Sequence, residues 1–288
     1  MNQKIEVITG PTASGKTSLA LQRSDGNPNV EIVNADASLL YRGFDIGTAK
    51  PSEEMRQRIP HYLIDIISPS ERFNAADYTK TARETIRKIV ERGKTPIVVG
   101  GTGFYIDALF YGITAANADE KKLEDARALV AREMKESGFD AMHERLRNID
   151  PQLHEQIVRE RNPRRLERAW EFYYATGIPL GVVRNNKPEP FEFEPSFTLI
   201  EVEKEKLWNN IVQRIDDMLA AGWLNEVERL IGKGVAPDMP AMNAIGYREL
   251  AAVLQGAKTL DETREDIIIR TRQYAKRQVT WMKRYKKA

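Results

Sequence analysis

A glycine-rich turn near the start of the chain constrains the fold more than any other feature. Residues 10–17 read GPTASGKT and fit the pattern G-x-x-x-x-G-K-[ST]. A strand-like run at residues 5–9 precedes the turn, and a helical pattern at residues 17–22 follows it. In this order, backbone N–H groups at the helix N-terminus surround phosphate oxygens. The pattern therefore predicts a polyphosphate site, and it specifies neither ATP nor hydrolysis. The expected diphosphate-binding residues are Gly10, Pro11, Thr12, Ala13, Ser14, Gly15, Lys16 and Thr17.

The rest of the first part of the chain alternates short apolar runs with helical patterns. Strand candidates lie at residues 31–34, 95–99 and 197–202, and a helix candidate lies at residues 75–92. Such alternation is typical of a parallel α/β sheet. We therefore predict a P-loop NTPase-like parallel sheet flanked by helices.

Residues 117–190 have a different character. Charged amphipathic patterns follow one another at residues 119–135, 139–147, 151–157 and 163–176, and no strand pattern interrupts them. We interpret this stretch as an all-helical insertion into a core made of residues 1–116 and 191–288. The core is expected to end in helices at residues 206–222, 224–232, 247–255 and 260–283.

Composition excludes several classes of protein. The 288 residues contain no cysteine, so disulfides and thiolate metal sites are excluded. No apolar run approaches the length of a membrane span, and residues 4–10 do not resemble a targeting sequence. We expect a cytoplasmic protein with no membrane partner. No coiled-coil seam indicates an obligate protein partner.

Although the net charge is only +2, the chain contains two basic clusters. One lies at residues 159–168, and the other occupies residues 264–287, where Glu265 and Asp266 are the only acids. Aromatic residues lie beside both clusters. Charge runs are often only solvated faces, but basic residues next to aromatics favour a nucleic-acid partner.

The position of the acids separates this chain from nucleotide hydrolases. In such enzymes an apolar strand usually ends in an aspartate that binds the metal ion. Here the strand at residues 95–99 runs into Gly-Gly-Thr, and the strand at residues 31–34 is the one followed by an acid, Asp36. An aspartate at this edge of a parallel sheet faces the ligand crevice. Asp36 is expected to hold metal-bound water or to accept a proton, unless it only caps a turn.

Several stretches together resemble the bacterial type of tRNA dimethylallyltransferase, also called tRNA isopentenyltransferase. Besides residues 10–17, the resemblance lies in DASLLYRGFDIGTAKP at 36–51 and GGTGFY at 100–105. It continues in NPRRLER at 162–168, AIGYR at 244–248 and KRQVTWMKR at 276–284. The phosphate loop is generic, whereas the stretch at 36–51 is highly specific. The similarity runs from residue 5 to about residue 285.

The resemblance implies a reaction. A dimethylallyl group passes from dimethylallyl diphosphate to the exocyclic amine of the adenosine 3′-adjacent to the anticodon, and diphosphate is released with the help of Mg²⁺. The phosphate loop then holds the donor's diphosphate without ATP turnover. By the resemblance, Asp36 is the base, Thr102 lies near the target nucleotide, Arg214 is an active-site cation, and Thr17 is the metal ligand.

The resemblance also implies a tRNA surface for the anticodon stem-loop, whose adenosine must leave its stack to react. The residues that match the family's RNA contacts are Asp36, Ala37, Ser38, Leu39, Arg164, Arg165, Arg168, Asn243, Gly246, Tyr247, Arg248, Lys276, Arg277, Gln278 and Trp281. Ala37 and Leu39 stand where many relatives have Ser and Gln, and Asn210 and Asn243 stand where Arg is frequent. The absence of cysteine excludes the zinc finger of eukaryotic members.

Three alternatives remain open from the residues. A P-loop kinase of small molecules would use the same loop and Mg²⁺ but would not need the basic regions. A prenyltransferase acting on free adenylates would share the donor site and lack much of the RNA surface. A non-catalytic RNA-binding P-loop protein would not need Asp36.

Overall fold

The computed structural model describes residues 3–113, 119–184 and 188–287. It divides into two compact units, Met1–Gly112 with Pro190–Ala288 and Ile113–Glu189. The helical insertion was expected at residues 117–190. The first of these two boundaries, residue 117, lies outside the described residues. None of the helices in the described ranges has the length and apolar character to cross a membrane.

The larger unit is built on a five-stranded sheet with the order β3-β2-β4-β1-β5. The strands are β1 Lys4–Thr9, β2 Val30–Asn34, β3 His61–Tyr62, β4 Thr95–Gly100 and β5 Glu194–Leu199. Every pairing is parallel, and Thr9 lies opposite both Gly100 and Leu199. The predicted P-loop NTPase-like class is confirmed. Strand β5 begins earlier than predicted and includes Pro195, which an edge strand tolerates because one side of it makes no ladder.

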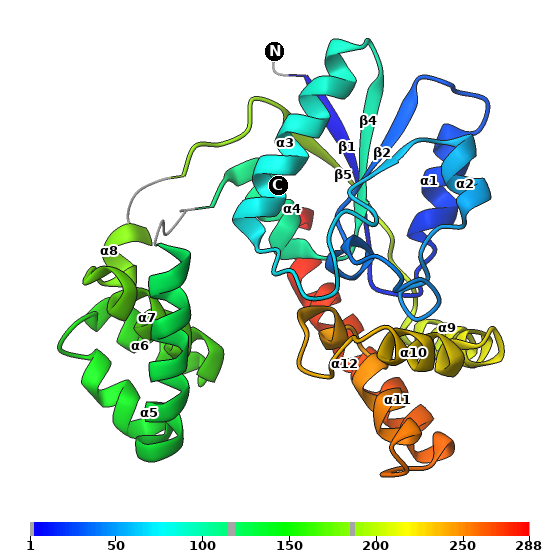
Figure 1. The fold of residues 1–288 in the computed structure, drawn as a ribbon. Coiled ribbons are helices and arrows are strands. Elements are labelled where there is room, and N and C mark those ends of the chain that lie inside the picture. The colour runs from blue at the N-terminus through cyan, green and yellow to red at the C-terminus, as the bar shows by residue number, and fades with distance from the viewer. Residues whose placement is uncertain (1–2, 114–118, 185–187, 288) are drawn as a thin grey trace. The chain divides into compact units, whose positions relative to one another are not determined.

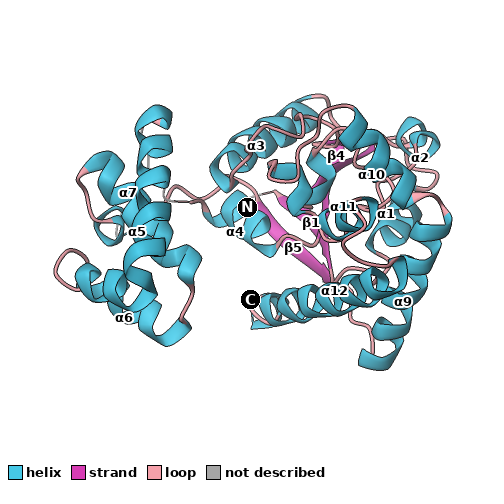
Figure 2. Cartoon of the chain, turned by 60° about the horizontal axis from the view of Figure 1, so that its bottom comes forward, coloured by secondary structure: helices cyan, strands magenta, loops and turns pink. Residues whose placement is uncertain are grey.

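Helices cover both faces of this sheet (Figures 1 and 2). They include α1 Lys16–Ser24, α2 Glu53–Arg58, α3 Ala75–Glu91 and α4 Gly103–Tyr111. Helix α3 begins with a capping box between Asn74 and Asp77. Its buried residues include Tyr78, Ala82 and Ile86, whose helical spacing places them on the face against the sheet.

The remaining helices of this unit gather beyond the carboxyl ends of the strands (Figure 1). They are α9 Lys204–Ala220, α10 Trp223–Gly232, α11 Tyr247–Leu254 and α12 Leu260–Met282, with short 3₁₀ turns η2 Pro240–Asn243 and η3 Tyr285–Lys287. Phe44, Trp223 and Tyr247 are fully buried in the core that these helices share. The Glu226 carboxylate accepts a 2.7 Å bond from the Tyr247 hydroxyl and a 2.8 Å bond from the Ile46 N–H, so it ties the loop before α2 to the helical layer.

The smaller unit is entirely helical in the part that is described, as predicted. It contains α5 Glu120–Leu146, α6 Pro151–Glu160, α7 Pro163–Thr176 and α8 Leu180–Arg184. Gly138 breaks α5 with a φ of 76°, which agrees with the two separate patterns expected there. Trp170 is buried at the centre of this unit, and its indole N–H donates to the Met142 carbonyl at 3.2 Å.

Candidate active site

The predicted phosphate loop connects β1 to α1 and has the backbone that an anion cradle requires. Ala13 has a φ of 61° and Gly15 a φ of 90°, so left-handed residues alternate along the turn and its N–H groups face inward. Gly10 has no room for a side chain, because an added Cβ would lie 2.6 Å from the Ser14 hydroxyl and 3.1 Å from the Ile200 Cβ. The sequence pattern therefore reflects both backbone conformation and close packing.

Lys16 is the cation of this loop. Its ammonium donates to the carbonyls of Gly10 at 3.0 Å and Pro11 at 2.8 Å. Burial lowers the pKa of Lys16 to about 8, the negative charge of Asp36 opposes that shift, and the positive charge of Arg214 adds to it. A bound polyanion would stabilise the charged form. These two charge effects indicate that Asp36 and Arg214 both lie near Lys16.

A pH dependence follows from this pKa. Below about pH 8 Lys16 is charged and attracts a diphosphate, and as the pH rises through this value the charge is lost. The affinity of the loop for inorganic diphosphate is expected to fall above about pH 8, by up to roughly tenfold per pH unit. In Lys16→Arg the break should move to higher pH, because the guanidinium keeps its charge. An unchanged break in that variant would assign the titration to another group.

Asp36 follows β2 and begins the 3₁₀ turn η1, Ala37–Leu40. Its Oδ1 accepts bonds from the Ser38 N–H at 3.1 Å and the Ser38 hydroxyl at 2.7 Å. The Asp36 N–H in turn donates to the Asn34 side chain at 2.8 Å. The side chain therefore caps a turn, as the simpler interpretation held, and its charge also acts on Lys16 and Arg214.

The segment after Asp36 is anchored by Lys50. Its ammonium is almost fully buried, with 2% of the side chain exposed, and it pairs with Asp45 at 2.7 Å and with Asp65. It also donates to the Tyr41 carbonyl at 2.9 Å. A buried lysine with these partners fixes the path of residues 41–50, which explains why so long a motif follows Asp36.

Thr102 lies in the turn between β4 and α4. Its N–H donates to the Ala35 carbonyl at 3.0 Å, and its hydroxyl accepts the Ala37 N–H at 3.1 Å. Thr102 is the N-cap residue of α4, but its side chain makes no capping hydrogen bond to that helix. A Cβ added at Gly100 would lie 2.2 Å from the Ala35 carbonyl carbon, so only glycine lets β2 and β4 place Asp36 and Thr102 side by side.

Arg214 reaches the site from α9. Its guanidinium donates to the Thr48 carbonyl at 3.5 Å. Burial lowers its pKa, and the negative charge of Asp36 opposes that effect. An arginine stays charged in proteins, so the site contains a permanent cation beside a titratable one. The structure thus brings together Lys16, Asp36, Thr102 and Arg214.

Tyr274 is a site residue that the sequence analysis did not assign. It lies on α12, and its phenol lies beside the Thr102 side chain and near Asp36. Burial raises the pKa of this phenol, and the charge of Asp36 raises it further, so the group remains a neutral donor. Helical spacing was the available signal, because Tyr274 lies four residues before Gln278 on the same face.

A model of one protein family matches residues 39–285, and its description is IPP transferase. This match includes Thr102, Arg214 and Tyr274 and extends over parts of both units, whereas Lys16 and Asp36 precede it. The chain belongs to the IPP transferase family. The phosphate loop precedes the matched region, so its assignment depends on the geometry above and on the relatives below.

Curated relatives of this IPP transferase are similar along almost its whole length. The tRNA dimethylallyltransferase of Pelotomaculum thermopropionicum is 42% identical over 281 residues, which is 97% of this chain and 88% of that protein. The tRNA dimethylallyltransferase 1 of Pelobacter propionicus is 43% identical over 282 residues, covering 96% and 89% of the two chains.

Solved structures show the same fold. The tRNA delta(2)-isopentenylpyrophosphate transferase of Staphylococcus epidermidis is 36% identical, with a TM-score of 0.68 and coverage of 98% of this chain and 90% of that one. A eukaryotic dimethylallyltransferase acting on tRNA is 29% identical, with a TM-score of 0.77 and coverage of 97% and 70%.

Some residues expected to contact tRNA lie inside this IPP transferase. Tyr247 is fully buried with its hydroxyl on Glu226, and Gly246 packs so closely on Trp223 that an added Cβ would lie 2.1 Å from the indole. Gln278 is buried against the phosphate loop, and the indole N–H of Trp281 donates to Asp107 at 3.1 Å. The side chains of Tyr247 and Gln278 therefore hold the fold together instead of facing RNA.

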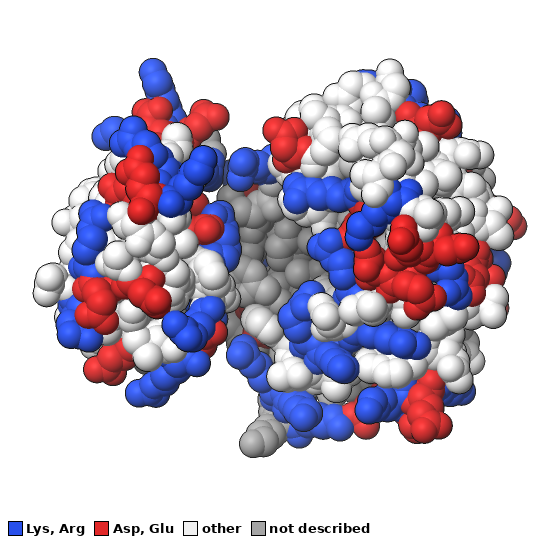
Figure 3. All heavy atoms as spheres, turned by 90° about the horizontal axis from the view of Figure 1, so that it is seen from below, with Lys and Arg blue, Asp and Glu red and all other residues white. Residues whose placement is uncertain are grey.

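Other expected contacts are accessible. Lys276 and Arg277 on α12, and Asn243 and Arg248 around α11, are exposed. The Lys276 ammonium lies 5.7 Å from the centre of the Trp208 ring. Figure 3 looks onto the end of the larger unit that carries these helices and shows basic side chains gathered beside a separate acidic patch. Ala37, Ser38 and Leu39 on η1 are half-buried beside Asp36.

The arginines expected to contact tRNA in the smaller unit are paired with acids. Arg164 contacts Glu171 at 2.8 Å, Arg168 contacts the same carboxylate at 3.5 Å, and Arg165 contacts Glu160 at 2.6 Å. Glu171 is buried, whereas Arg164 and Arg165 are exposed. This cluster is therefore less positive than its sequence indicates.

The smaller unit also contains His143, Glu144 and His154, whose ligand atoms lie within 4.8 Å of one another. The two imidazole rings are stacked with centroids 4.0 Å apart and an angle of 18° between their planes. Lone pairs of nearly parallel rings lie in nearly parallel planes and do not converge on one ion. The His143 Nε2 also lies 3.1 Å from the His154 carbonyl. We therefore assign no metal to this group.

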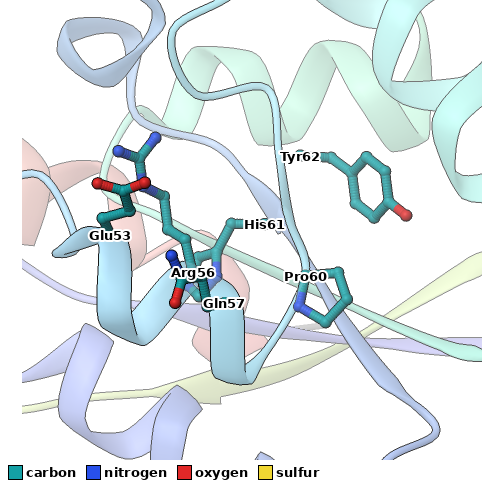
Figure 4. Close-up of a pocket in the computed structure, with 6 residues that line it drawn as sticks. All are labelled: Glu53, Arg56, Gln57, Pro60, His61 and Tyr62. Carbon is teal, nitrogen blue, oxygen red and sulfur yellow. The ribbon is translucent and has the colours of Figure 1, made fainter.

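A pocket at the edge of the sheet is lined by Glu53, Arg56, Gln57, Pro60, His61 and Tyr62 (Figure 4). It lies against β3, which the sheet order separates from β1 by two strands. Arg56 is paired with Asp65 at 2.8 Å, and the His61 ring lies 2.6 Å from the Ile59 carbonyl. Arg56 thus has an acidic partner, although its buried Nε has no hydrogen-bond partner within the described residues. Because the pocket lies away from the phosphate loop, we assign no ligand to it.

Proposed function

We propose that this chain transfers a dimethylallyl group from dimethylallyl diphosphate to the exocyclic amine of the adenosine 3′-adjacent to the anticodon in tRNA, and releases diphosphate. One observation carries the proposal. A carboxylate, Asp36, and two cations, Lys16 and Arg214, meet at the mouth of an anion-binding loop. The names of the curated relatives support the same transfer to tRNA.

The arrangement fits the chemistry of the transfer. The adenine amine is a weak nucleophile, because its lone pair is conjugated with the ring. As the new C–N bond forms, the amine loses a proton, which the Asp36 carboxylate accepts. The C–O bond of the donor breaks with its electron pair on the diphosphate. Lys16, Arg214 and the N–H groups of residues 13–17 stabilise this growing negative charge.

Thr102 and Tyr274 hold the other side of this site. The Thr102 hydroxyl accepts the Ala37 N–H, so η1 and the turn after β4 are fixed relative to each other, and the Tyr274 phenol lies beside Thr102. The change to Ala37 leaves this bond intact, because the donor is a backbone N–H. We expect these groups to surround the flipped adenine.

The same loop fits Mg²⁺. The Thr17 hydroxyl in the first turn of α1 and the Asp36 carboxylate are oxygen ligands, which this ion prefers. The buried Ser14 hydroxyl of the same loop has no hydrogen-bond partner within the described residues. We propose that Thr17 holds the ion, which when bound neutralises charge on the leaving diphosphate.

The structure does not favour a kinase. Strand β4 ends at Gly100 and is followed by Gly101 and Thr102, so the carboxylate that a nucleotide hydrolase places at the end of this strand is missing. An adenylate prenyltransferase would need no basic face, and here α12 carries exposed Lys276 and Arg277.

Competition between acceptors tests the proposal. Labelled dimethylallyl diphosphate is supplied together with an unmodified anticodon stem-loop and excess AMP. We expect the label to appear in the RNA at a rate that AMP does not reduce. Label in AMP would assign the chain to the adenylate class. Phosphoryl transfer from ATP to a small acceptor, without labelled RNA, would assign it to the kinases.

The tRNA surface is tested with Arg165. Its replacement by alanine is expected to weaken stem-loop binding and to reduce the slope of log K against log salt by about 0.7–0.9, which corresponds to one lost phosphate contact. Arg147→Ala, another exposed arginine of the smaller unit, is the matched control and should leave the slope unchanged. Equal slopes for wild type and Arg165→Ala would remove Arg165 from the RNA surface.

A further inference from the structure

The phosphate loop contains one residue in an uncommon conformation. Ala13 has a φ of 61°, which residues with a Cβ seldom adopt. Such a conformation persists only where the surrounding structure holds it. The contacts on either side of Ala13 therefore indicate what keeps the loop in its anion-binding shape.

Gln278 of α12 holds the loop on one side. Its Oε1 accepts the Thr12 N–H at 2.8 Å, and its Nε2 donates to the Gly101 carbonyl at 3.0 Å. The side chain is 5% exposed, so these bonds are shielded from water. A Cβ added at Gly101 would lie 2.2 Å from this Nε2, which shows how closely the amide fits.

Asn210 of α9 holds the loop on the other side. Its Nδ2 donates to the Ala13 carbonyl at 3.1 Å. The two amides thus fix the peptide groups immediately before Thr12 and immediately after Ala13. Between them lie the backbone angles that turn the N–H groups of residues 13–17 toward an anion.

We propose that Gln278 and Asn210 are positioning residues for the donor diphosphate, which they serve by holding Thr12 and Ala13 in the left-handed turn. The inference rests on the proposed function, because it takes the anion in this loop to be the donor's diphosphate. It places Gln278 at the donor site and not on the tRNA surface. Its neighbours Lys276 and Arg277 are exposed on the same helix.

If the two amides have this role, their loss should weaken binding of the donor and leave binding of tRNA unchanged. Loss of either amide loosens the cradle, so diphosphate binds more weakly and the donor KM rises. The tRNA surface should be unchanged, because Gln278 is buried and the amides of Gln278 and Asn210 both bond to the phosphate loop. A residue that only stabilised the fold would lower the fraction of active protein and leave both KM values unaltered.

The test uses Gln278→Met and Asn210→Ala, with Gln273→Ala and Asn209→Ala as matched controls. Gln273 and Asn209 are exposed residues of the same type on the same two helices. Calorimetry measures the affinity for inorganic diphosphate with Mg²⁺, kinetics give the donor KM and kcat, and a binding assay gives the stem-loop Kd. Circular dichroism and melting verify the fold of each variant.

We expect Gln278→Met to weaken diphosphate binding by about tenfold or more and Asn210→Ala by about threefold to tenfold, as the loss of two and one hydrogen bonds predicts. The stem-loop Kd should stay within about twofold of wild type. A raised stem-loop Kd with normal diphosphate affinity would overturn the proposal.

Two further outcomes are informative. Should Gln278→Met fail to fold, Asn210→Ala decides, and normal diphosphate affinity in that variant overturns the proposal. Failure of the proposed function has a different signature. Wild-type protein would then bind diphosphate without prenylating the stem-loop, while the calorimetric comparison would still test the two amides.

Discussion

Replacing Asp36 with asparagine is expected to lower kcat by about 10²–10⁴-fold, the usual contribution of a positioned general base. Asparagine keeps an oxygen that can accept the Ser38 bonds, so the η1 turn should persist while the proton acceptor is lost. The stem-loop Kd is expected to stay near the wild-type value. Single-turnover transfer, measured with saturating donor and RNA, gives the chemical rate directly.

The matched control is Asp25→Asn, an exposed aspartate that lies outside the site and is expected to keep full activity. A collapse of RNA affinity in Asp36→Asn, with a normal rate for the RNA that still binds, would contradict the assignment of Asp36 as the base. It would then be an RNA-binding residue.

Replacing Lys16 with methionine should have an effect of similar size through a different step. The variant loses the loop's own cation, so both donor binding and the stabilisation of departing diphosphate suffer. We expect kcat/KM for the donor to fall by about 10²–10³-fold, comparable to the loss of one preorganised charge-stabilising group. Steady-state kinetics at pH 7 measure the effect, because Lys16 is mostly charged there.

Lys4→Met changes an exposed lysine on β1 and controls for the loss of a positive charge elsewhere. RNA affinity should be the same in both variants and in wild type. If Lys16→Met bound diphosphate as tightly as wild type, the loop would not be the donor site.

The fold could be predicted wherever periodicity was strong. The buried strands β1, β2 and β4 are short runs rich in Ile and Val bounded by turns, and α3 and α12 have long amphipathic patterns. Strand β3 has two residues and α2 has six, so neither offers a period to detect. Helix α4 was missed because it is apolar nearly all round and follows a glycine-rich turn.

Asp36 could be predicted as a site residue because strand ends meet at one edge of a parallel sheet. Thr102 and Arg214 were predicted from the family resemblance alone, and the structure brings all three to the phosphate loop. The sequence did not show which residues of α12 face the site. Its basic pattern indicated RNA for the whole stretch, whereas in the structure Gln278 and Tyr274 face the phosphate loop and Thr102.

The ion pairs between arginines and glutamates in the smaller unit could not be predicted from the sequence either. Glu160 and Glu171 are close to Arg164, Arg165 and Arg168 along the chain, but only the helix geometry shows which pairs form. Tyr247 provides a similar case. The next residue in the motif, Arg248, is exposed, whereas the start of α11 places the Tyr247 ring in the core.

The most direct measurement is the chemical identity of the product. Purified protein is incubated with dimethylallyl diphosphate, Mg²⁺ and an unmodified anticodon stem-loop, and the RNA is digested to nucleosides for mass analysis. The account predicts a prenylated adenosine from the position 3′ to the anticodon, released diphosphate and no consumption of added ATP. Unmodified RNA together with steady hydrolysis of ATP would contradict it.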